Sequence, residues 1–117
     1  MKWQIRGLNI KVNGPVGEYA AEKIRKPLER FARQVESIVL RFADTPHAHD
    51  GAPRVTKAMV LMHDGSIVSV EQKEHDFYAA IDVLSDRVRR AVRRHMGRKQ
   101  KINRKRHGLG KRKLRGG

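Results

Sequence analysis

Near the N-terminus, apolar and polar residues alternate, which is typical of a strand with one buried face. The apolar positions of this segment are Trp3, Ile5 and Leu8. The same period of two returns from Ile38 to Phe42 and predicts a second strand. The next segment, from Ala43 to Pro53, is rich in aspartate, glycine and proline, and we expect a loop there.

Between these two strands, from Val16 to Arg33, the apolar period becomes that of a helix. Asn13 is the predicted N-cap. Pro27 lies inside this segment. A proline there removes one hydrogen bond and crowds the preceding turn, at a cost of roughly 3 kcal/mol. We therefore expect a kink at Pro27 or a helix broken in two. The apolar side is formed by Val16, Ala20, Ile24, Leu28 and Phe31.

The dipeptide Asp64-Gly65 separates two further apolar segments, residues 55–62 and 67–71. Asp-Gly favours a two-residue type I′ turn, so we predict a β-hairpin. We expect the helices to cover the face formed by two cross-strand pairs of this hairpin. These pairs are Leu61 with Val68 and Met59 with Val70.

A long amphipathic helix is predicted after Asp76, which is a favourable N-cap residue. We expect Gly97 to end or weaken this helix. From Arg98 onwards the chain has almost no apolar residues, and we expect it to be disordered when free. The apolar stripe of the helix is Phe77, Ile81, Leu84, Val88, Ala91 and Val92.

The predicted order is strand, helix, strand, strand, strand, helix. The first two strands are expected to be parallel and the others to form an antiparallel meander. We therefore predict an α+β, βαβββα two-layer sandwich, a four-stranded sheet with two helices on one face. Residues 1–101 would form this domain, and residues 102–117 a flexible, basic, disordered tail.

Charge is distributed very unevenly along the chain. The 27 Lys and Arg residues outnumber the 12 Asp and Glu residues and give a net charge of +15. The first 86 residues contain 12 of each sign, whereas the last 31 contain 15 basic residues and no acid. A neutral body with a basic arm indicates a polyanionic partner, either nucleic acid or an anionic membrane. The arm has few apolar residues that could insert into lipid, so we favour nucleic acid.

Several function classes receive no support from the residues. There is no cysteine, which excludes disulfides and thiol catalysis, and there is no apolar block of membrane-spanning or signal-peptide type. His47, His49 and Asp50 could bind a metal, but nothing nearby completes a tetrahedral site, so we interpret them as surface residues. We predict a cytoplasmic protein without catalytic activity, cofactor, metal or small-molecule substrate, and a monomer when free.

The segment Asp76-Phe77-Tyr78-Ala79-Ala80-Ile81-Asp82, followed by a basic amphipathic helix, resembles the signature of the ribosome hibernation-promoting factor family. That family includes ribosome-associated inhibitor A (protein Y), and its members were also called sigma-54 modulation proteins. The start of the chain, with Ile5, Gly7 and Asn9, is similar too. So is the segment Glu22-Lys23-Ile24-Arg25-Lys26 leading to Phe31 and Arg33.

The resemblance covers about residues 2 to 101 and implies the βαβββα fold, similar to double-stranded-RNA-binding domains. It also implies binding to small-subunit ribosomal RNA in the decoding region, in the path of mRNA and of the A- and P-site tRNAs. Pro27 departs from the family pattern. So does the lack of the C-terminal dimerisation domain of the long forms, which leaves open whether ribosomes are paired or only inactivated singly. By position, the family's RNA-binding residues correspond to Lys23, Lys26, Arg30, Arg33, Arg87, Arg90, Arg94 and Lys101.

From the charge pattern we add Arg98 and the tail residues Arg104, Lys105 and Arg106 to this predicted RNA-binding set. Guanidinium groups suit the task because they form paired hydrogen bonds to phosphate oxygens. The hypothesis requires the cationic sides of both helices to form one continuous surface. Helices that turned these sides away from each other would contradict it. Arg89 and Arg93 are predicted to lie further round the last helix.

Other interpretations stay open. The basic stripe of the first helix could be an ordinary solvated face, because glutamates intervene there. Tyr78 could stack on a base or simply pack against the protein. The protein could instead be a structural ribosomal protein or a general RNA chaperone. The older family name suggests a transcription modulator, which no residue pattern here supports.

Overall fold

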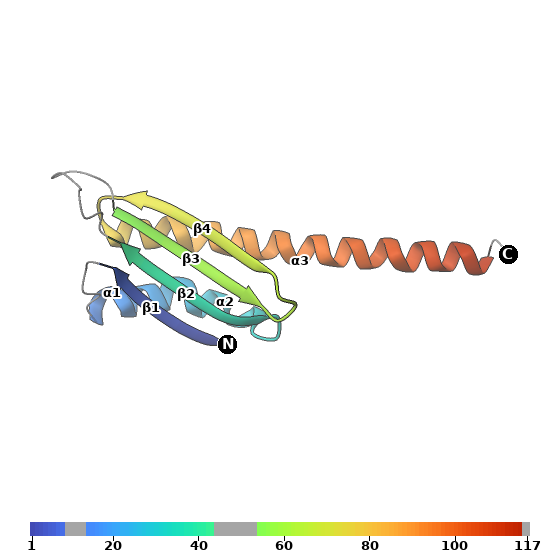
Figure 1. Ribbon diagram of the computed structural model, residues 1–117, viewed down its shortest axis with the longest axis horizontal. Coiled ribbons are helices and arrows are strands. Elements are labelled where there is room, and N and C mark those ends of the chain that lie inside the picture. Colours follow the sequence, from blue (N-terminus) through green and yellow to red (C-terminus); the bar gives the residue numbers. More distant parts are fainter. Residues whose placement is uncertain (9–13, 44–53, 116–117) are drawn as a thin grey trace.

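A computed structural model describes the backbone of residues 1–8, 14–43 and 54–115, and the side chains of residues 1–7, 14–43 and 54–98. The predicted α+β class and βαβββα order are confirmed. All four strands form one sheet in the order β1-β2-β3-β4, with β1 parallel to β2 and the other pairs antiparallel. Figure 1 shows both helical runs on one face of this sheet. The strands are β1 (Lys2–Leu8), β2 (Val35–Ala43), β3 (Arg54–Met62) and β4 (Ile67–Glu74).

The first helical run continues through Pro27, but not as a regular α-helix. The amide of Lys26 donates to the carbonyl of Ala21, five residues back, which is the π-helical pattern. Pro27 has no N–H to donate, and its ring would crowd the carbonyl of Lys23 in a regular helix, so a wider turn before it relieves both problems. The run consists of α1 (Gly14–Ala20), the π-helical η1 (Ala21–Arg25), α2 (Lys26–Leu28) and the 3₁₀-helical η2 (Glu29–Phe31).

The last helix, α3 (Phe77–Arg115), begins as predicted and ends much later. Asp76 caps it, because the Asp76 carboxylate accepts the amide of Tyr78 at 3.2 Å. Gly97 does not end the helix, which leaves the other expectation, that Gly97 weakens it, as a prediction. A glycine inside a helix costs only about 1 kcal/mol relative to alanine, and the neighbouring residues favour helix. Beyond the sheet, α3 projects without other elements beside it (Figure 1).

The disorder predicted for residues 102–117 in the free protein remains a prediction. The backbone of this segment is helical as far as Arg115. A helix without packing partners depends on its intrinsic propensity alone, which Gly108 and Gly110 lower. The boundary between a folded domain and a tail at residue 101 is therefore untested.

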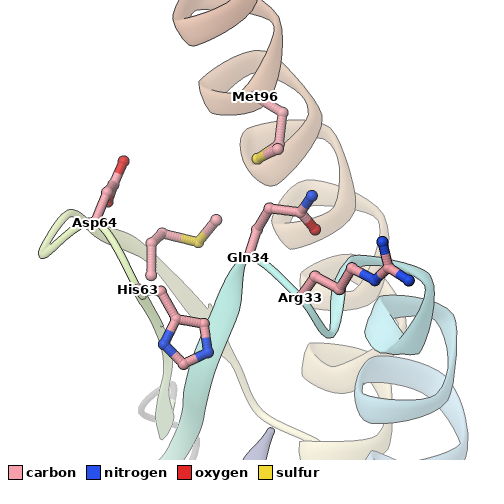
Figure 2. Close-up of a pocket in the computed structure, with 6 residues that line it drawn as sticks. Arg33, Gln34, His63, Asp64 and Met96 are labelled. Atoms are coloured by element: carbon pink, nitrogen blue, oxygen red, sulfur yellow. The ribbon is translucent and has the colours of Figure 1, made fainter.

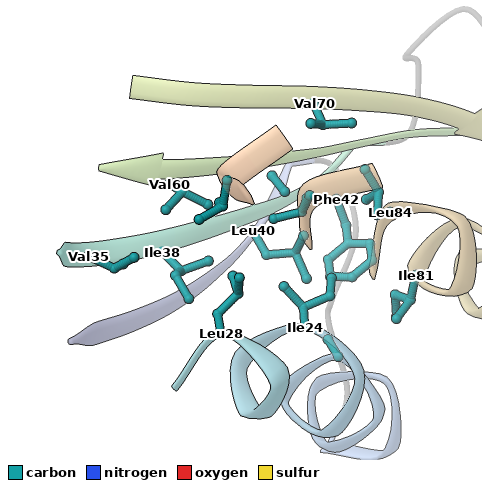
Figure 3. Close-up of a cluster of buried hydrophobic side chains, with 14 of the residues drawn as sticks. Ile24, Leu28, Val35, Ile38, Leu40, Phe42, Val60, Val70, Ile81 and Leu84 are labelled. Atoms are coloured by element: carbon teal, nitrogen blue, oxygen red, sulfur yellow. The ribbon is translucent and has the colours of Figure 1, made fainter. Parts of the chain in front are cut away.

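The core fills the single interface between the sheet and the helices (Figure 3). Phe42 of β2 lies at its centre and meets the ring of Phe77 edge-on, with the two ring centroids 4.8 Å apart. The apolar stripes predicted for both helices point into this layer; Val16, Phe31 and Ala91 are only partly buried at its margin. The fully buried side chains of Figure 3 include Ile24, Leu28, Val35, Ile38, Leu40, Val60, Ile81 and Leu84.

The predicted pairing of the β3–β4 hairpin was wrong by one residue. The turn contains three residues rather than two: Met62 and Ser66 pair across it, and the amide of Gly65 donates to the carbonyl of Met62. Gly65 has φ of 90°, the left-handed conformation that such a three-residue turn needs. A shift by one residue exchanges the two faces of a strand. The actual cross-strand pairs are Val60 with Val68, Ala58 with Val70, and Leu61 with Ile67.

This shift places Val60, Met62 and Val70 under the helices, whereas Met59 and Leu61 lie on the opposite face. Two other predictions, the N-cap at Asn13 and the loop at 44–53, lie outside the described residues. Where the structure describes the chain, it contains no helix that is both long and apolar enough to cross a membrane.

Candidate nucleic-acid interface

The first helical run and α3 lie side by side and contact each other through α1 and η1. Near the start, the hydroxyl of Tyr19 donates a short hydrogen bond to the carboxylate of Asp82. Near the end, Arg33 and Met96 line the same hollow of about 130 Å³, shown in Figure 2. The first run from residue 19 to 33 therefore follows α3 from residue 82 to 96. We call the solvent-facing surface between these two segments the helix seam.

An aromatic and cationic cluster marks the start of the seam. The Tyr19 and Tyr78 rings meet edge-on with centroids 5.1 Å apart, and the ammonium of Lys23 lies 5.7 Å from the Tyr19 centroid. The hydrogen bond to Asp82 raises the pKa of Tyr19 above its ordinary value, because ionisation would place two negative charges together. Tyr78 is 38% exposed, so its ring packs against Tyr19 and also reaches solvent.

The cations predicted on the first helix are all exposed, and one of them pairs with a carboxylate. Lys26 forms an i,i+4 ion pair with Glu22 at 3.2 Å. The Arg30 guanidinium lies over the ring of Phe31, 4.6 Å from its centroid. No carboxylate among the described residues pairs with Lys23, Arg30 or Arg33. The four predicted cations are Lys23, Lys26, Arg30 and Arg33, and Arg25, which is also exposed, pairs with Glu29.

The stripe predicted on α3 points toward the edge strand β4 rather than toward the first helical run. The Arg87 guanidinium donates to the carbonyl of Glu71 and to the side-chain oxygen of Gln72, both at 2.7 Å. A hollow of about 300 Å³ is lined by Arg87, Arg90 and Arg94 together with Val70 of β4. The predicted stripes of the two helices therefore do not face each other. The exposed members of this stripe are Arg87, Arg90, Arg94 and Arg98.

Arg89 and Arg93 are the α3 cations that lie at the seam. They follow Asp82 by seven and eleven positions, which places all three on the same side of a helix. Asp82 bonds to the first helical run, so this side borders the seam. Sequence reasoning left both arginines out of the predicted set. Their spacing was visible, but which flank of α3 the other helix occupies was not.

Together, these arginines surround the solvent-facing half of α3. Val88 and Val92 are buried on the inner side, and arginines at the intervening positions continue from the β4 edge to the seam. Asp86 interrupts them and pairs with Arg90 and Arg89. The hydrogen bond from Arg90 holds the pKa of Asp86 below its usual range. Arg89 and Arg93, rather than the predicted stripe, thus connect the cations of α3 to those of the first run.

The remaining predicted site residues cannot be placed by their side chains. Lys101, Arg104, Lys105 and Arg106 are in the backbone of α3, and their side chains lie outside the described residues. The alternative metal site at His47, His49 and Asp50 also lies outside them. Within the described ranges, no three metal-binding side chains gather at one point.

Comparison with known proteins identifies relatives over most of the chain. A family model described as "Sigma 54 modulation protein / S30EA ribosomal protein" matches residues 3–100. A ribosome hibernation promotion factor of Deinococcus radiodurans is 31% identical over 94 residues, covering 79% of this chain and 47% of the relative. One of Staphylococcus aureus is 28% identical over 106 residues, covering 90% and 52%. The chain thus spans about half the length of these relatives.

Solved structures show the same fold. A ribosomal subunit interface protein from Coxiella burnetii superposes with a TM-score of 0.68 at 16% identity, covering 83% of this chain and 99% of that one. The N-terminal domain of protein Y from Thermus thermophilus gives a TM-score of 0.65 at 21% identity, covering 81% and 99%. At these identities the likeness establishes the architecture, and the site has to be argued from this chain's own residues.

Proposed function

The chain belongs to the Sigma 54 modulation protein / S30EA ribosomal protein family, and from that premise we propose that it is a ribosome hibernation factor. In this proposal it binds small-subunit ribosomal RNA in the decoding region and inhibits translation by idle ribosomes. The names of two relatives, both ribosome hibernation promotion factors, support this role. The function is one of binding and occlusion, without a catalytic step.

The observation that carries the proposal is the set of cations on the helix layer. Lys23 on the first helical run, Arg33 in the turn that follows it and Arg93 on α3 are exposed and have no carboxylate partner among the described residues. Cations without acidic partners on one face of the protein form a positive surface that attracts polyanions. The phosphates of RNA supply such an anion, and the counterions released on binding favour the complex.

The rigidity of the sheet suits this array to folded RNA. Duplex RNA hides its base edges in a deep groove, so proteins recognise its shape and phosphates. Both helices are fixed to one four-stranded sheet by the shared core, so the backbone positions that carry these cations are held in a fixed arrangement. A protein that occupied the mRNA and tRNA path in this way would inhibit initiation by excluding both ligands.

Co-sedimentation with purified small subunits at moderate salt, combined with an in-vitro translation assay, tests the proposal. The informative variant carries Lys23→Glu and Arg93→Glu, one reversal on each side of the seam. We expect it to bind small subunits about tenfold or more weakly and to inhibit translation correspondingly less. The matched control is Lys2→Glu with Lys73→Glu, two reversals among exposed residues of the sheet, which should bind like the parent.

Two results would contradict the proposal. One is the absence of both inhibition and co-sedimentation by the parent protein. The other is equally tight binding to free RNA hairpins and to assembled subunits, which would favour the alternative of a general RNA chaperone or structural ribosomal protein. If the control variant lost binding as much as the seam variant, the interaction would follow net charge rather than a located site.

A further inference from the structure

The face of the sheet opposite the helices carries a row of cations that crosses three strands. Arg6 of β1 is in register with Arg41 of β2, and Arg41 is in register with Lys57 of β3. Like charges directly opposite each other on neighbouring strands destabilise a sheet. At one end of the row, Lys57 is in register with Glu71 of β4, without an ion pair between the two side chains. No carboxylate of the described residues lies within ion-pair distance of these three cations.

An aliphatic patch adjoins this row on the same face. Val39 of β2 is in register with Met59 of β3, two residues along the strands from the Arg41–Lys57 pair. Leu61, two residues beyond Met59, is in register with Ile67 of β4. Ile67 is 63% exposed, and the other three are partly exposed. No helix of the described chain covers this face, as Figure 1 shows. Contiguous exposed apolar side chains mark interaction sites more often than isolated ones do.

We propose that this open sheet face is a docking surface for an acidic protein segment that also carries aliphatic side chains. The segment's carboxylates would pair with the cationic row, and its apolar side chains would cover Met59 and its neighbours. Methionine and arginine are enriched in protein–protein interfaces, where an apolar centre is surrounded by a polar rim. The inference concerns a second surface and does not rest on the proposed function of the helix layer.

Two other occupants fit this face less well. RNA would pair with the cations, but it has no use for an aliphatic patch, and none of the six aromatic side chains lies on this face to stack on a base. A second copy of the chain, placed face to face, would bring two identical cationic rows together. Charge and apolarity combined therefore point to an acidic protein partner.

Methionine methyl groups allow a direct test on the full chain, because its four methionines report on different surfaces. Met59 lies on the open sheet face, Met62 is buried, and Met96 lies near the seam. The probes are a soluble peptide of alternating Glu and Leu, a peptide of equal length with alternating Glu and Ser, and an RNA hairpin. We expect the Glu–Leu peptide to shift the Met59 methyl signal saturably and the RNA hairpin to shift that of Met96.

Two substitutions locate the binding. Arg41→Glu places a carboxylate between Arg6 and Lys57, so it should fold well and still bind the Glu–Leu peptide about tenfold or more weakly. Met59→Ser keeps the net charge and should weaken binding of the Glu–Leu peptide by a similar factor. Because this variant lacks the Met59 methyl probe, its binding is measured by fluorescence anisotropy of the labelled peptide. The seam variant, Lys23→Glu with Arg93→Glu, is the matched control and should bind the peptide like the parent.

Three outcomes would overturn the inference: no Met59 shift with the Glu–Leu peptide, equal affinity for the Glu–Ser peptide, or a Met59 shift produced by RNA instead. The last outcome would assign the face to nucleic acid. Failure of the proposed function has a different signature. It would leave peptide binding at Met59 intact while the parent protein failed to bind small subunits.

Discussion

The helix-covered face and the open face of the sheet are built from the same four strands, but they differ in what their alternate residues do. On the covered face, Leu40 and Val60 are buried and hold both helices in place. On the open face, Arg41, the residue after Leu40, and Lys57, three residues before Val60, are in register in a row that faces solvent. Stability and recognition are thus separated between the alternate residues of each strand. One set of residues builds the core, and the other is available to partners.

The helix seam adds a third surface, with a different chemistry from the open sheet face. It combines cations with two tyrosine rings, of which Tyr78 is exposed, and these groups suit phosphates and bases. The open sheet face combines cations with aliphatic side chains. Substitutions that damage one surface and spare the other are therefore the sharpest way to test the comparison.

The largest expected effect comes from the core that all surfaces share. Phe42→Ala should lower the free energy of unfolding by about 3–5 kcal/mol, because it removes a fully buried ring and leaves a cavity against Phe77. Urea denaturation followed by circular dichroism measures this. Val39→Ala, on the same strand but on the open face, should cost less than about 1 kcal/mol. Similar losses for both variants would contradict the separation between alternate residues.

A smaller effect is expected from removing the basic segment after Lys101. Small-subunit binding should weaken, and the slope of log K against log salt should flatten by about 0.7–0.9 for each phosphate that the shortened protein no longer neutralises. Chemical footprinting should still protect the same RNA, because the folded helix layer determines location. The seam variant, Lys23→Glu with Arg93→Glu, should instead remove the footprint. The opposite pattern would mean that the basic segment determines where the protein binds.

A substitution at Thr56, on the covered face, should raise the free energy of unfolding rather than lower it. Its hydroxyl oxygen is buried and has no hydrogen-bond partner within the described residues. Thr56→Val keeps the shape and removes the unsatisfied group, so thermal unfolding should show a gain of about 1 kcal/mol. Ser69→Ala, on the open face of the neighbouring strand, is the control and should be nearly neutral. A loss of stability in Thr56→Val would show that the hydroxyl has a partner, such as a bound water.

The smallest effect concerns ionisation at the seam. The hydrogen bond to Asp82 raises the pKa of Tyr19 in the folded state above the ordinary value of 10.0. Its contribution to stability is thus complete below that ordinary value and is lost as pH rises through the folded pKa. Ultraviolet titration of a Tyr78→Phe variant, in which Tyr19 is the remaining tyrosine, should show this raised pKa. Adding Asp82→Asn should return it toward the ordinary value, and no change would contradict the assigned cause.

Much of the fold could be predicted because it depends on local patterns. Alternation around Trp3 and Phe42 identified strands, the period near Ile24 identified a helix, and the cap at Asp76 marked where α3 begins. The prediction was wrong where a local sequence is compatible with two conformations. Asp64-Gly65 is compatible with two-residue and three-residue turns, and the choice decided which face of β3 is buried.

The candidate site was predictable in composition but not in arrangement. The excess of arginine on the last helix is a property of the sequence, and so is the basic stripe of the first. Which arginines border the other helix depends on how α3 is rotated against the sheet, and that rotation follows from packing around Val88 and Val92. For this reason Arg89 and Arg93 were missed, while Arg87 was assigned to RNA although it bonds to β4.

The class of fold, the order of its elements and the excess of positive charge follow from local patterns along the chain, because propensity, periodicity and net charge are properties of nearby residues. The hairpin pairing, the π-helical turn before Pro27, the composition of the helix seam and the cationic row across β1, β2 and β3 depend on packing in three dimensions. These features depend on which distant segments become neighbours. Their free energies come from contacts that exist only once the sheet and helices have packed.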